Sequence, residues 1–270
     1  MSVFDREWQF LQVERKGESP GDLLWVTLDN TEKANALSPP LIQEITTLYE
    51  SDLRAEGIRA VLLRGAGKNF SAGADLEHLE SLRDAGPEDN QEDSEALRRL
   101  FASVLWQPAL TVAVVHGACV AGGCGLATAH DYVVASAGAR FLYSEVRIGF
   151  VAGLVATYLP LRVKGRDLRE MLLDPQFLDA DRALEVGLVN RVAPPDQLDE
   201  TAHTLAGNIL QNASSESIAR TKLLLLDAVG RPLEEALHRA ARVNAESRAT
   251  DDCRHGIATF LRTKRPPVWR

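Results

Sequence analysis

The sequence predicts an α/β fold in which a strand-rich core is followed by an all-helical C-terminal region. Two observations support this prediction. Short apolar, β-branched runs alternate with amphipathic segments through the first part of the chain, and only helical periodicity follows the pair Pro194 and Pro195. We therefore divide the chain into a core of residues 1–193, which carries the functional site, and a helical region of residues 194–270.

Residues 112–131 form the clearest junction between a strand and a helix. Residues 112–115 are apolar and β-branched, and Gly122, Gly123 and Gly125 follow before a small apolar run. Such a turn presents free backbone N–H groups at a helix N-terminus, where negative charge is stabilised. No phosphate-loop lysine or G-x-G-x-x-G spacing is present. The stretch therefore indicates backbone donors aimed at a carbonyl oxygen, although tight packing of a helix on a strand also favours glycine.

The elements before this junction are predicted from capping residues and periodicity. Ser38 followed by Pro39 is typical of a helix start, and the helix is expected to end near residue 55. Asp75 suits a second helix N-terminus. The acidic residues 84–95 predict a mobile surface segment. The other expected elements are strands at 8–15, 23–28 and 58–64, a turn at 17–21, and a helix at 97–105.

The elements after the junction are predicted in the same way. Two short strands, a loop and three short helices precede a last strand, and four helices complete the chain. The expected strands are 132–135, 140–143 and 188–192, and the expected helices are 154–163, 166–173, 180–186, 198–210, 217–228, 232–245 and 251–261.

Composition and charge argue against nucleic acid and metal ions as binding partners. The chain has 270 residues, of which 45% are hydrophobic and 25% charged, as is typical of a globular protein. The net charge of -8 and the sequence pI of about 5.3 argue against nucleic acid as a partner. Three cysteines form no disulfide framework and no zinc-ligand pattern, so we expect no metal site.

The same reasoning predicts the location of the protein. The first residues, MSVFDRE, are too polar for a signal peptide, and no apolar run reaches the length of a membrane span. We therefore expect a cytoplasmic protein that does not bind membranes.

Six motifs occur along the chain in a characteristic order. They are EKANALS at 32–38, FSAGADL at 70–76, AGGCGLA at 121–127, YSEVRIGF at 143–150, ALEVGLVNR at 183–191 and FLRTKRPPVW at 260–269. Together they resemble the crotonase superfamily, the enoyl-CoA hydratases and isomerases, over nearly the whole chain. The third and fourth motifs look like the branch related to methylglutaconyl-CoA hydratases.

The resemblance implies a spiral of strand–strand–helix units and a helical C-terminal region that builds homotrimers, often paired into homohexamers. It implies an acyl-CoA thioester as substrate, in fatty acid or branched acid metabolism. No separate cofactor is implied, because coenzyme A is part of the substrate.

The resemblance also implies the catalytic residues. The backbone N–H groups of Ala74 and Gly122 match the oxyanion hole, which binds the thioester carbonyl. Small residues at Ala72 and Gly123 keep that site open. The family hydratases carry two glutamates, of which one matches Glu145.

The other family glutamate falls on position 125, which is glycine here. With one carboxylate, Glu145 either moves the proton alone or has a helper. A glutamate placed at position 125 is tolerated only if space for a side chain remains there. The possible helpers are Asp75, Glu77, His78, His116, His130, Asp131, Tyr143 and Arg147.

Coenzyme binding is implied for a second group of residues. Lys33, Ala34 and Ala36 match the loop that lines the adenine and pantetheine path. Lys264 or Arg265 matches a basic residue that reaches a neighbouring subunit's nucleotide phosphate. Asp75 and Leu76, which follow the first oxyanion residue, complete the expected substrate-binding set.

Three functions remain open on the sequence. Hydration of a 2-enoyl-CoA is the first hypothesis, with Glu145 deprotonating water and returning the proton to Cα. Double-bond isomerisation is the alternative, because one carboxylate suffices for it. A non-catalytic acyl-CoA-binding scaffold is an alternative of another class, which the missing glutamate at Gly125 favours and the retained Glu145 opposes.

Overall fold

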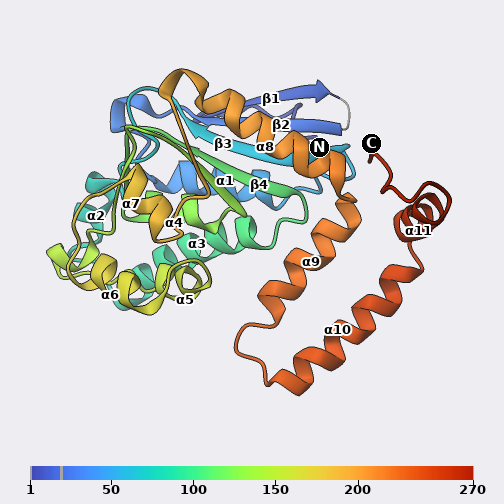
Figure 1. The fold of residues 1–270 in the computed structure, drawn as a ribbon. Coiled ribbons are helices and arrows are strands. Elements are labelled where there is room, and N and C mark those ends of the chain that lie inside the picture. Colours follow the sequence, from blue (N-terminus) through green and yellow to red (C-terminus); the bar gives the residue numbers. More distant parts are fainter. Residues whose placement is uncertain (1, 19–20, 270) are drawn as a thin grey trace.

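A six-stranded sheet forms the centre of the molecule (Figure 1), and the computed structural model describes residues 2–18 and 21–269. The strand order is β1-β2-β3-β4-β6-β9. The first pair is antiparallel and every later pair is parallel. The strands are β1 (Leu11–Glu18), β2 (Gly21–Leu28), β3 (Ile58–Gly65), β4 (Leu110–Val115), β6 (Tyr132–Ser136) and β9 (Arg191–Ala193).

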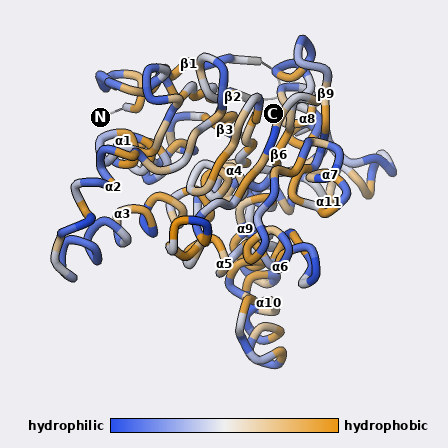
Figure 2. Tube along the Cα trace, turned by 90° about the vertical axis from the view of Figure 1, so that its left-hand side faces the viewer, coloured by the Kyte–Doolittle hydropathy of each residue, from blue (hydrophilic) through white to orange (hydrophobic). Residues whose placement is uncertain are grey.

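Helices cover both faces of this sheet, which is why its central strands are apolar throughout. Alternate residues of β3 show the two faces. Val61 and Leu63 pack with α1 (Pro39–Tyr49), α3 (Pro87–Leu105) and α4 (Gly122–Ala129). Ala60 and Leu62 pack with α8 (Leu198–Asn212), which crosses the sheet in Figure 1. The hydropathy colouring of Figure 2 shows the same distribution, with hydrophobic residues gathered between sheet and helices.

Three short strands, which are interspersed in the sequence with the last strands of the large sheet, form a second, smaller sheet. Its order is β5-β7-β8, with β5 (Ala118–Val120), β7 (Arg140–Leu142) and β8 (Leu178–Asp179). β5 directly follows Gly117, whose φ of 58° places it in the left-handed region. A Cβ at this position would lie 2.0 Å from the carbonyl oxygen of Lys68, so only glycine fits this turn.

The remaining elements are short helices around the core and three long helices at the end. The short ones are η1 (Thr31–Lys33), α2 (Leu76–Leu82), η2 (Glu145–Ile148), α5 (Val155–Tyr158), η3 (Leu159–Leu161), α6 (Gly165–Leu173), α7 (Ala180–Glu185) and η4 (Pro195–Gln197). The long ones are α9 (Ser215–Asp227), α10 (Leu233–Arg248) and α11 (Asp251–Thr263). We call α9–α11 the C-terminal arm, because Figure 1 shows it extending away from the sheet.

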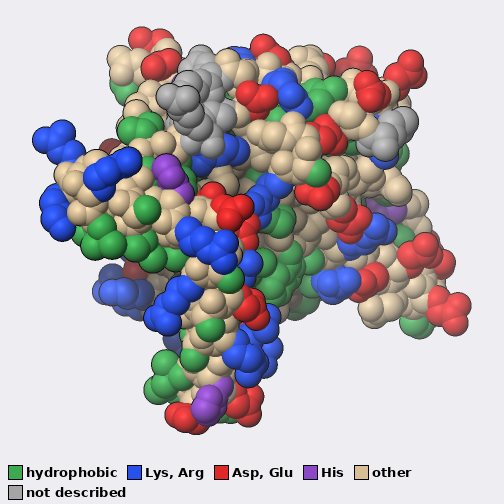
Figure 3. Space-filling model, turned by 90° about the vertical axis from the view of Figure 1, so that its right-hand side faces the viewer, with side chains coloured by type: hydrophobic (Ala, Val, Ile, Leu, Met, Phe, Trp, Pro, Cys, Tyr) green, Lys and Arg blue, Asp and Glu red, His purple; other side chains and the backbone are tan. Residues whose placement is uncertain are grey.

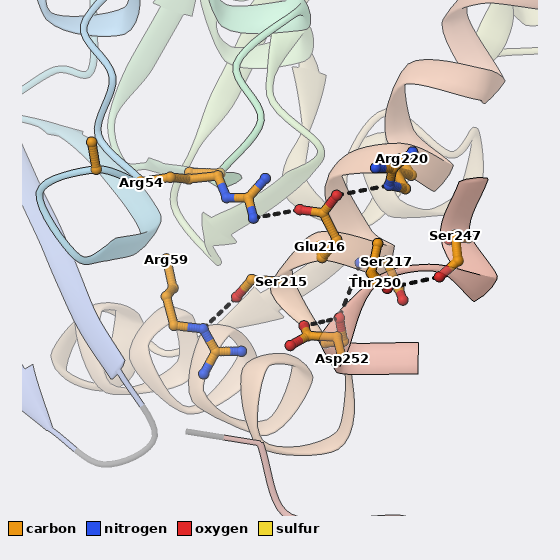
Figure 4. Close-up of polar contacts among 12 residues, drawn as sticks. Arg54, Arg59, Ser215, Glu216, Ser217, Arg220, Ser247, Thr250 and Asp252 are labelled. Atoms are coloured by element: carbon orange, nitrogen blue, oxygen red, sulfur yellow. Dashed lines mark hydrogen bonds and ion pairs between the residues drawn. The ribbon is translucent and has the colours of Figure 1, made fainter. Parts of the chain in front are cut away.

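Polar contacts join the arm to the core at the start of α9. Arg54 donates to Glu216 at 2.7 Å, and Glu216 also accepts from Arg220 at 2.7 Å (Figure 4). Farther along α9, the buried Lys222 lies 2.7 Å from Asp131 and 3.2 Å from the carbonyl oxygen of Ala109. These contacts attach the start of α9 to the core, whereas the turn between α9 and α10 lies away from the core in Figure 1.

The α/β fold with a helical C-terminal region is confirmed, and most predicted elements are present. One prediction was wrong. The acidic residues 84–95 lie on the surface, but from Pro87 onward they form the start of α3, where Asp89 accepts a hydrogen bond from the N–H of Gly86. Proline at the first helical position starts a helix rather than breaking one.

Smaller differences concern the boundaries of elements. The predicted helix 154–163 is two short helices, α5 and η3, with Pro160 inside the second. The last strand of the large sheet begins at Arg191 rather than at residue 188. The predicted turn at 17–21 includes residues 19–20, which lie outside the described residues. The division of the chain at residue 193 stays a prediction.

Two further findings concern the chain as described. All three cysteines are free thiols, and Cys119 and Cys124 are buried. Among residues 2–18 and 21–269, no helix is both long and apolar enough to cross a membrane.

Candidate active site

Three chain segments meet beside the N-terminus of α4. The segment 71–75 lies between the loop 33–37 and the segment 117–123. The backbone hydrogen bonds that join them run from Leu37 N–H to Gly73 O at 2.7 Å, from Ala72 N–H to Ala34 O at 2.9 Å, and from Val120 N–H to Ser71 O at 3.0 Å. Residues far apart in the sequence are therefore held in one backbone network.

The two predicted oxyanion donors lie on adjoining segments of this network. A Cβ on Gly73, the residue before Ala74, would lie 2.6 Å from the carbonyl oxygen of Val120 and 3.1 Å from Cβ of Ala121, the residue before Gly122. Within the described part of the chain, neither the Ala74 nor the Gly122 N–H donates a hydrogen bond to another protein atom. Two unpaired donors are thus available side by side.

Ala121 holds a backbone conformation that is rare for a residue with a side chain. Its φ is 46° and its ψ is -119°. Its own N–H donates to the carbonyl oxygen of Leu142 at 2.7 Å. Backbone strain of this kind costs about 1–3 kcal/mol and persists only where the surroundings enforce it. Here it sets the orientation of the next peptide group, which carries the Gly122 N–H.

The small residues around the donors serve two purposes. Ala72 and Ala74 are exposed, so their short side chains leave the surface beside the donors open. Gly123 is buried, and a Cβ there would lie 2.8 Å from the side chain of Ser71. Gly123 is therefore required for packing of α4 on the neighbouring segment.

Glu145 has a buried side chain with one carboxylate oxygen unpaired within the described chain. It is the first residue of η2 and is only 9% exposed. Its Oε2 is buried and has no hydrogen-bond partner among the described residues. Burial raises the pKa of its carboxyl group, and a hydrogen bond from its own backbone N–H opposes this shift only partly. A buried carboxylate oxygen without a partner is costly and points to a functional role.

The position of the missing second glutamate is closed. A Cβ at Gly125 would lie 2.8 Å from Cζ of Phe101, 2.9 Å from Cγ2 of Val155 and 3.2 Å from Oη of Tyr158. Space for a side chain does not remain, so the condition for placing a glutamate there is not met. Sequence reasoning missed these three residues, because no short-range pattern indicates that α3 and α5 pack against position 125.

The helpers considered for Glu145 have other partners. The pKa of His130 is lowered to about 3, mainly by burial, and its ring nitrogens bond Tyr49 at 2.7 Å and the carbonyl oxygen of Leu126 at 2.8 Å. The remaining pairs are His78 with Asp93, His116 with Gly67 O, Arg147 with Pro175 O, Asp131 with Lys222 and Thr111, and Tyr143 with Thr128.

Lys33 lies beside Asp75, one of the predicted substrate residues. Its ammonium is 2.9 Å from Asp75 and 2.6 Å from Glu77. Asp75 also accepts hydrogen bonds from the N–H groups of Glu77 and His78, which confirms the predicted helix cap. Burial alone would raise the pKa of Asp75, but the hydrogen bonds from Lys33 and these N–H groups lower it.

Of the other expected substrate residues, Lys264 is the one that lies far from the oxyanion donors. Ala36 is buried within the loop, Ala34 is half-buried with a φ of 50°, and Leu76 is 78% exposed. Lys264, in contrast, ends α11, which lies across the molecule from α2 (Figure 1). Within one chain the structure does not bring Lys264 to the site.

Two hollows elsewhere contain none of the predicted oxyanion or coenzyme residues, although His130 and Asp131, two of the helpers considered for Glu145, line the second one. One, of about 610 Å³, lies at the base of the arm and contains the Arg54–Glu216 pair shown in Figure 4. The other, of about 770 Å³, lies between the core and α9 and is mostly apolar. Among the residues that the structure describes, no cluster of His, Cys, Asp and Glu could hold a metal ion.

Comparisons with known proteins show similarity along nearly the whole chain. Residues 18–270 match the family model "Enoyl-CoA hydratase/isomerase". A putative enoyl-CoA hydratase of Thermus thermophilus is 43% identical over 258 residues, covering 95% of this chain and 99% of that protein. A mitochondrial Delta(3,5)-Delta(2,4)-dienoyl-CoA isomerase of Dictyostelium discoideum is 29% identical, with 98% and 92% covered. The crystal structure of an enoyl-CoA hydratase from Shewanella pealeana has a TM-score of 0.88 at 28% identity, covering 99% of this chain and 98% of that one.

Proposed function

Because the chain belongs to the enoyl-CoA hydratase/isomerase family of enzymes, we propose that it hydrates the double bond of a 2-enoyl-CoA thioester. The observation that carries this proposal is the buried, unpaired Oε2 of Glu145. An unpaired oxygen of an ionised carboxylate is an acceptor for a water proton. The burial that raises its pKa also makes it a stronger base.

The unpaired N–H groups of Ala74 and Gly122 are suited to bind the thioester oxygen of the substrate. As water adds to Cβ, electron density moves to the thioester oxygen. Two backbone donors already in position stabilise that developing charge, and the loss of one such donor typically costs about 100- to 1,000-fold in rate. The strained conformation of Ala121 supports this role, because it holds one donor in place before substrate binds.

Glu145 then completes the reaction by moving one proton. The water oxygen forms a bond to Cβ while the Cα–Cβ double bond opens toward Cα. Glu145 takes the proton from the water and returns it to Cα, so that the product is a 3-hydroxyacyl-CoA and the carboxylate is regenerated.

The coenzyme is proposed to lie along the loop 33–37. Lys33, Ala34 and Ala36 would line its path, with Asp75 and Leu76 on the facing segment. Lys33 shares its charge with Asp75 and Glu77. A nucleotide phosphate would compete with these carboxylates for the ammonium.

Isomerisation of a 3-enoyl-CoA is the second candidate. The closed space at Gly125 favours it, because moving a double bond needs one base and no water. The same Glu145 would take a proton from Cα and return it to Cγ. The scaffold alternative has less support, since a non-catalytic protein has no use for a buried unpaired carboxylate.

A homotrimer, or a homohexamer made of two trimers, is proposed as the functional assembly. Leu225, Leu233 and Leu237 on the arm are 70%, 75% and 55% exposed. Figure 3 shows hydrophobic side chains gathered in the recess between arm and core. Apolar surface of this kind marks an interface. A neighbouring subunit would also bring Lys264 to a coenzyme that it does not reach in its own chain. The cytoplasmic location and the methylglutaconyl-CoA branch stay predictions.

Crotonyl-CoA and a 3-enoyl-CoA separate the two reactions. Hydration removes the conjugation between double bond and thioester, whereas isomerisation creates it, so ultraviolet absorbance changes in opposite directions. We expect wild type to consume crotonyl-CoA and to form 3-hydroxybutyryl-CoA. Conversion of the 3-enoyl-CoA alone, with crotonyl-CoA bound but unchanged, would replace hydration by isomerisation.

A further inference from the structure

The hydroxyl of Ser71 joins two of the three segments that meet beside α4. Ser71 is fully buried, and its Oγ donates a hydrogen bond to the carbonyl oxygen of Asn35 at 2.7 Å. The same Oγ accepts a hydrogen bond from the N–H of Gly73 at 3.2 Å. One buried side chain therefore connects the loop 33–37 with the turn that leads to Ala74.

The third segment also packs against Ser71. The N–H of Ser71 donates to the carbonyl oxygen of Ala118 at 3.3 Å, and the carbonyl oxygen of Ser71 accepts from the N–H of Val120 at 3.0 Å. A Cβ on Gly123 would lie 2.8 Å from both Cβ and Oγ of Ser71. Ser71 thus lies against the chain on both sides of Gly122, which carries the second oxyanion donor.

The direction of the Ala74 N–H depends on the peptide group that it shares with the carbonyl of Gly73. This carbonyl oxygen accepts a hydrogen bond from the N–H of Leu37 at 2.7 Å. Because C=O and N–H point in opposite directions in a trans peptide group, the bond directs the Ala74 N–H away from Leu37. Gly73 has a φ of 90° and no side chain to restrict it, so the hydrogen bonds of its two peptide groups fix its conformation. Leu37 holds one of these groups, and the Ser71 hydroxyl holds the other.

We propose that Ser71 is a positioning residue of the oxyanion hole, whose hydroxyl fixes the turn at Gly73 and thereby aims the Ala74 N–H at the thioester oxygen. This inference rests on the proposed function, which assigns that N–H to the substrate carbonyl. Ser71 is buried and its hydroxyl bonds two backbone groups, so it acts through Ala74 and takes no part in proton transfer. Without the hydroxyl, the N–H of Gly73 and the carbonyl oxygen of Asn35 lose this partner, and the turn is no longer fixed.

The test compares Ser71→Ala with Ser103→Ala. Ser103 on α3 is the matched control, because its buried hydroxyl also donates to a backbone carbonyl, that of Leu100, at 2.7 Å. Three quantities are measured: the carbonyl stretching frequency of bound, unreactive butyryl-CoA with an isotope label at the thioester carbon, kcat for crotonyl-CoA and the melting temperature. The infrared band reports on the oxyanion hole directly, because hydrogen bonds to a carbonyl lower its stretching frequency.

We expect Ser71→Ala to shift the carbonyl band toward that of free butyryl-CoA. It should lower kcat about tenfold or more, which is less than the loss of a whole oxyanion donor typically costs. Ser103→Ala should lower the melting temperature to a similar extent and keep the wild-type band and kcat. If Ser71→Ala does not fold, Ser71→Cys takes its place, because a thiol is a weaker hydrogen-bonding group, and its band should shift in the same direction.

The opposite results overturn the inference. If the Ser71 variant keeps the wild-type carbonyl band, or if Ser103→Ala shifts the band equally, Ser71 has a structural role alone. If butyryl-CoA bound to wild type shows the frequency of the free thioester, the oxyanion assignment is wrong and this role is wrong with it. Failure of the proposed hydration differs from both, because wild type would then lower the carbonyl frequency but leave crotonyl-CoA unchanged. In that case the band of the Ser71 variant alone decides the role of Ser71.

Discussion

The ammonium of Lys222 on α9 lies 2.7 Å from Asp131, which lies between α4 and β6. Lys222 also contacts Ala109 just before β4, and Asp131 contacts Thr111 within β4. Asp131 accepts hydrogen bonds from the N–H and the hydroxyl of Thr111 at 2.8 and 2.9 Å. Burial lowers the pKa of Lys222, and the charge of Asp131 opposes that shift. This ion pair connects the C-terminal arm with the strand that leads to the site.

Replacing Lys222 by methionine tests how much the pair contributes. The variant leaves Asp131 without its cation, and breaking a buried pair costs about 3–5 kcal/mol. Because Asp131 is partly exposed, at 21%, we expect the lower end of that range in urea unfolding. Arg231→Met is the matched control, since its pair with Asp227 is half-exposed and is worth about 1 kcal/mol or less. Equal losses in both variants would contradict the structural role of Lys222.

Glu145→Gln should lower turnover at least about 100-fold, the low end for general acid–base catalysis. Binding of butyryl-CoA should survive, because the backbone donors are untouched. Steady-state kinetics and calorimetric titration measure the two quantities. Glu95→Gln, which affects an exposed ion pair with Arg98, is the control. A Glu145→Gln variant as active as wild type would remove Glu145 as the acid–base residue.

The raised pKa of Glu145 predicts opposite effects of pH on activity and stability. Activity requires the carboxylate, so kcat/KM should fall as pH drops through a pKa above the usual range for glutamate. Because the folded state binds this proton more tightly than the unfolded state, the favourable contribution is complete below the unfolded pKa and is lost as pH rises through the folded one. Glu145→Gln should therefore be more stable than wild type at pH 8, and this difference should shrink toward pH 4. Unfolding curves at both pH values provide the check, and a constant difference would contradict it.

Gly125→Ala should destabilise the protein by about 1–3 kcal/mol, because the added methyl group meets Phe101 and Val155 below 3 Å. Gly125→Glu should destabilise the protein more than Gly125→Ala does, and it should not restore a second catalytic carboxylate. Gly207→Ala in α8 is the opposite case, since its Cβ meets nothing within 4 Å. That variant should gain up to about 1 kcal/mol. Thermal unfolding of the three variants, run together, measures the contrast.

Ending the chain before Phe260 should weaken coenzyme binding and loosen the trimer together. The shortened chain loses the end of α11 and with it Lys264, which the proposed assembly brings to a neighbour's coenzyme. Light scattering and titration with coenzyme A measure the two effects. Unchanged affinity in the shortened protein would show that α11 is not part of the site.

The sequence predicts best where the signal is local. Asp75 caps α2, proline follows Ser38 at the start of α1, and the helices of the C-terminal region were found from their periodicity. The acidic start of α3 was misinterpreted because charge suggests disorder, whereas Pro87 and Asp89 begin a helix there. β5 was missed because three residues carry no measurable alternation.

Motif order indicates the backbone positions of the candidate site but not the side chains that pack around it. Motif order alone indicated Ala74, Gly122 and Glu145. Tyr158 has no such signal, because it belongs to a four-residue helix and meets Gly125 only after two segments, 33 positions apart, have packed together. Relationships of this kind depend on tertiary structure, which no short-range pattern encodes.

The three segments that meet beside α4 also have a consequence for the order of folding. They begin at residues 33, 71 and 117, and they follow the three parallel strands β2, β3 and β4, which must pair before the segments can meet. Contacts between such distant residues form slowly, because the intervening chain loses entropy first. The proposed coenzyme site therefore forms only in the completely assembled core. A ligand held there would stabilise the whole cooperative unit, by about 2.7 kcal/mol at a hundredfold excess over its Kd.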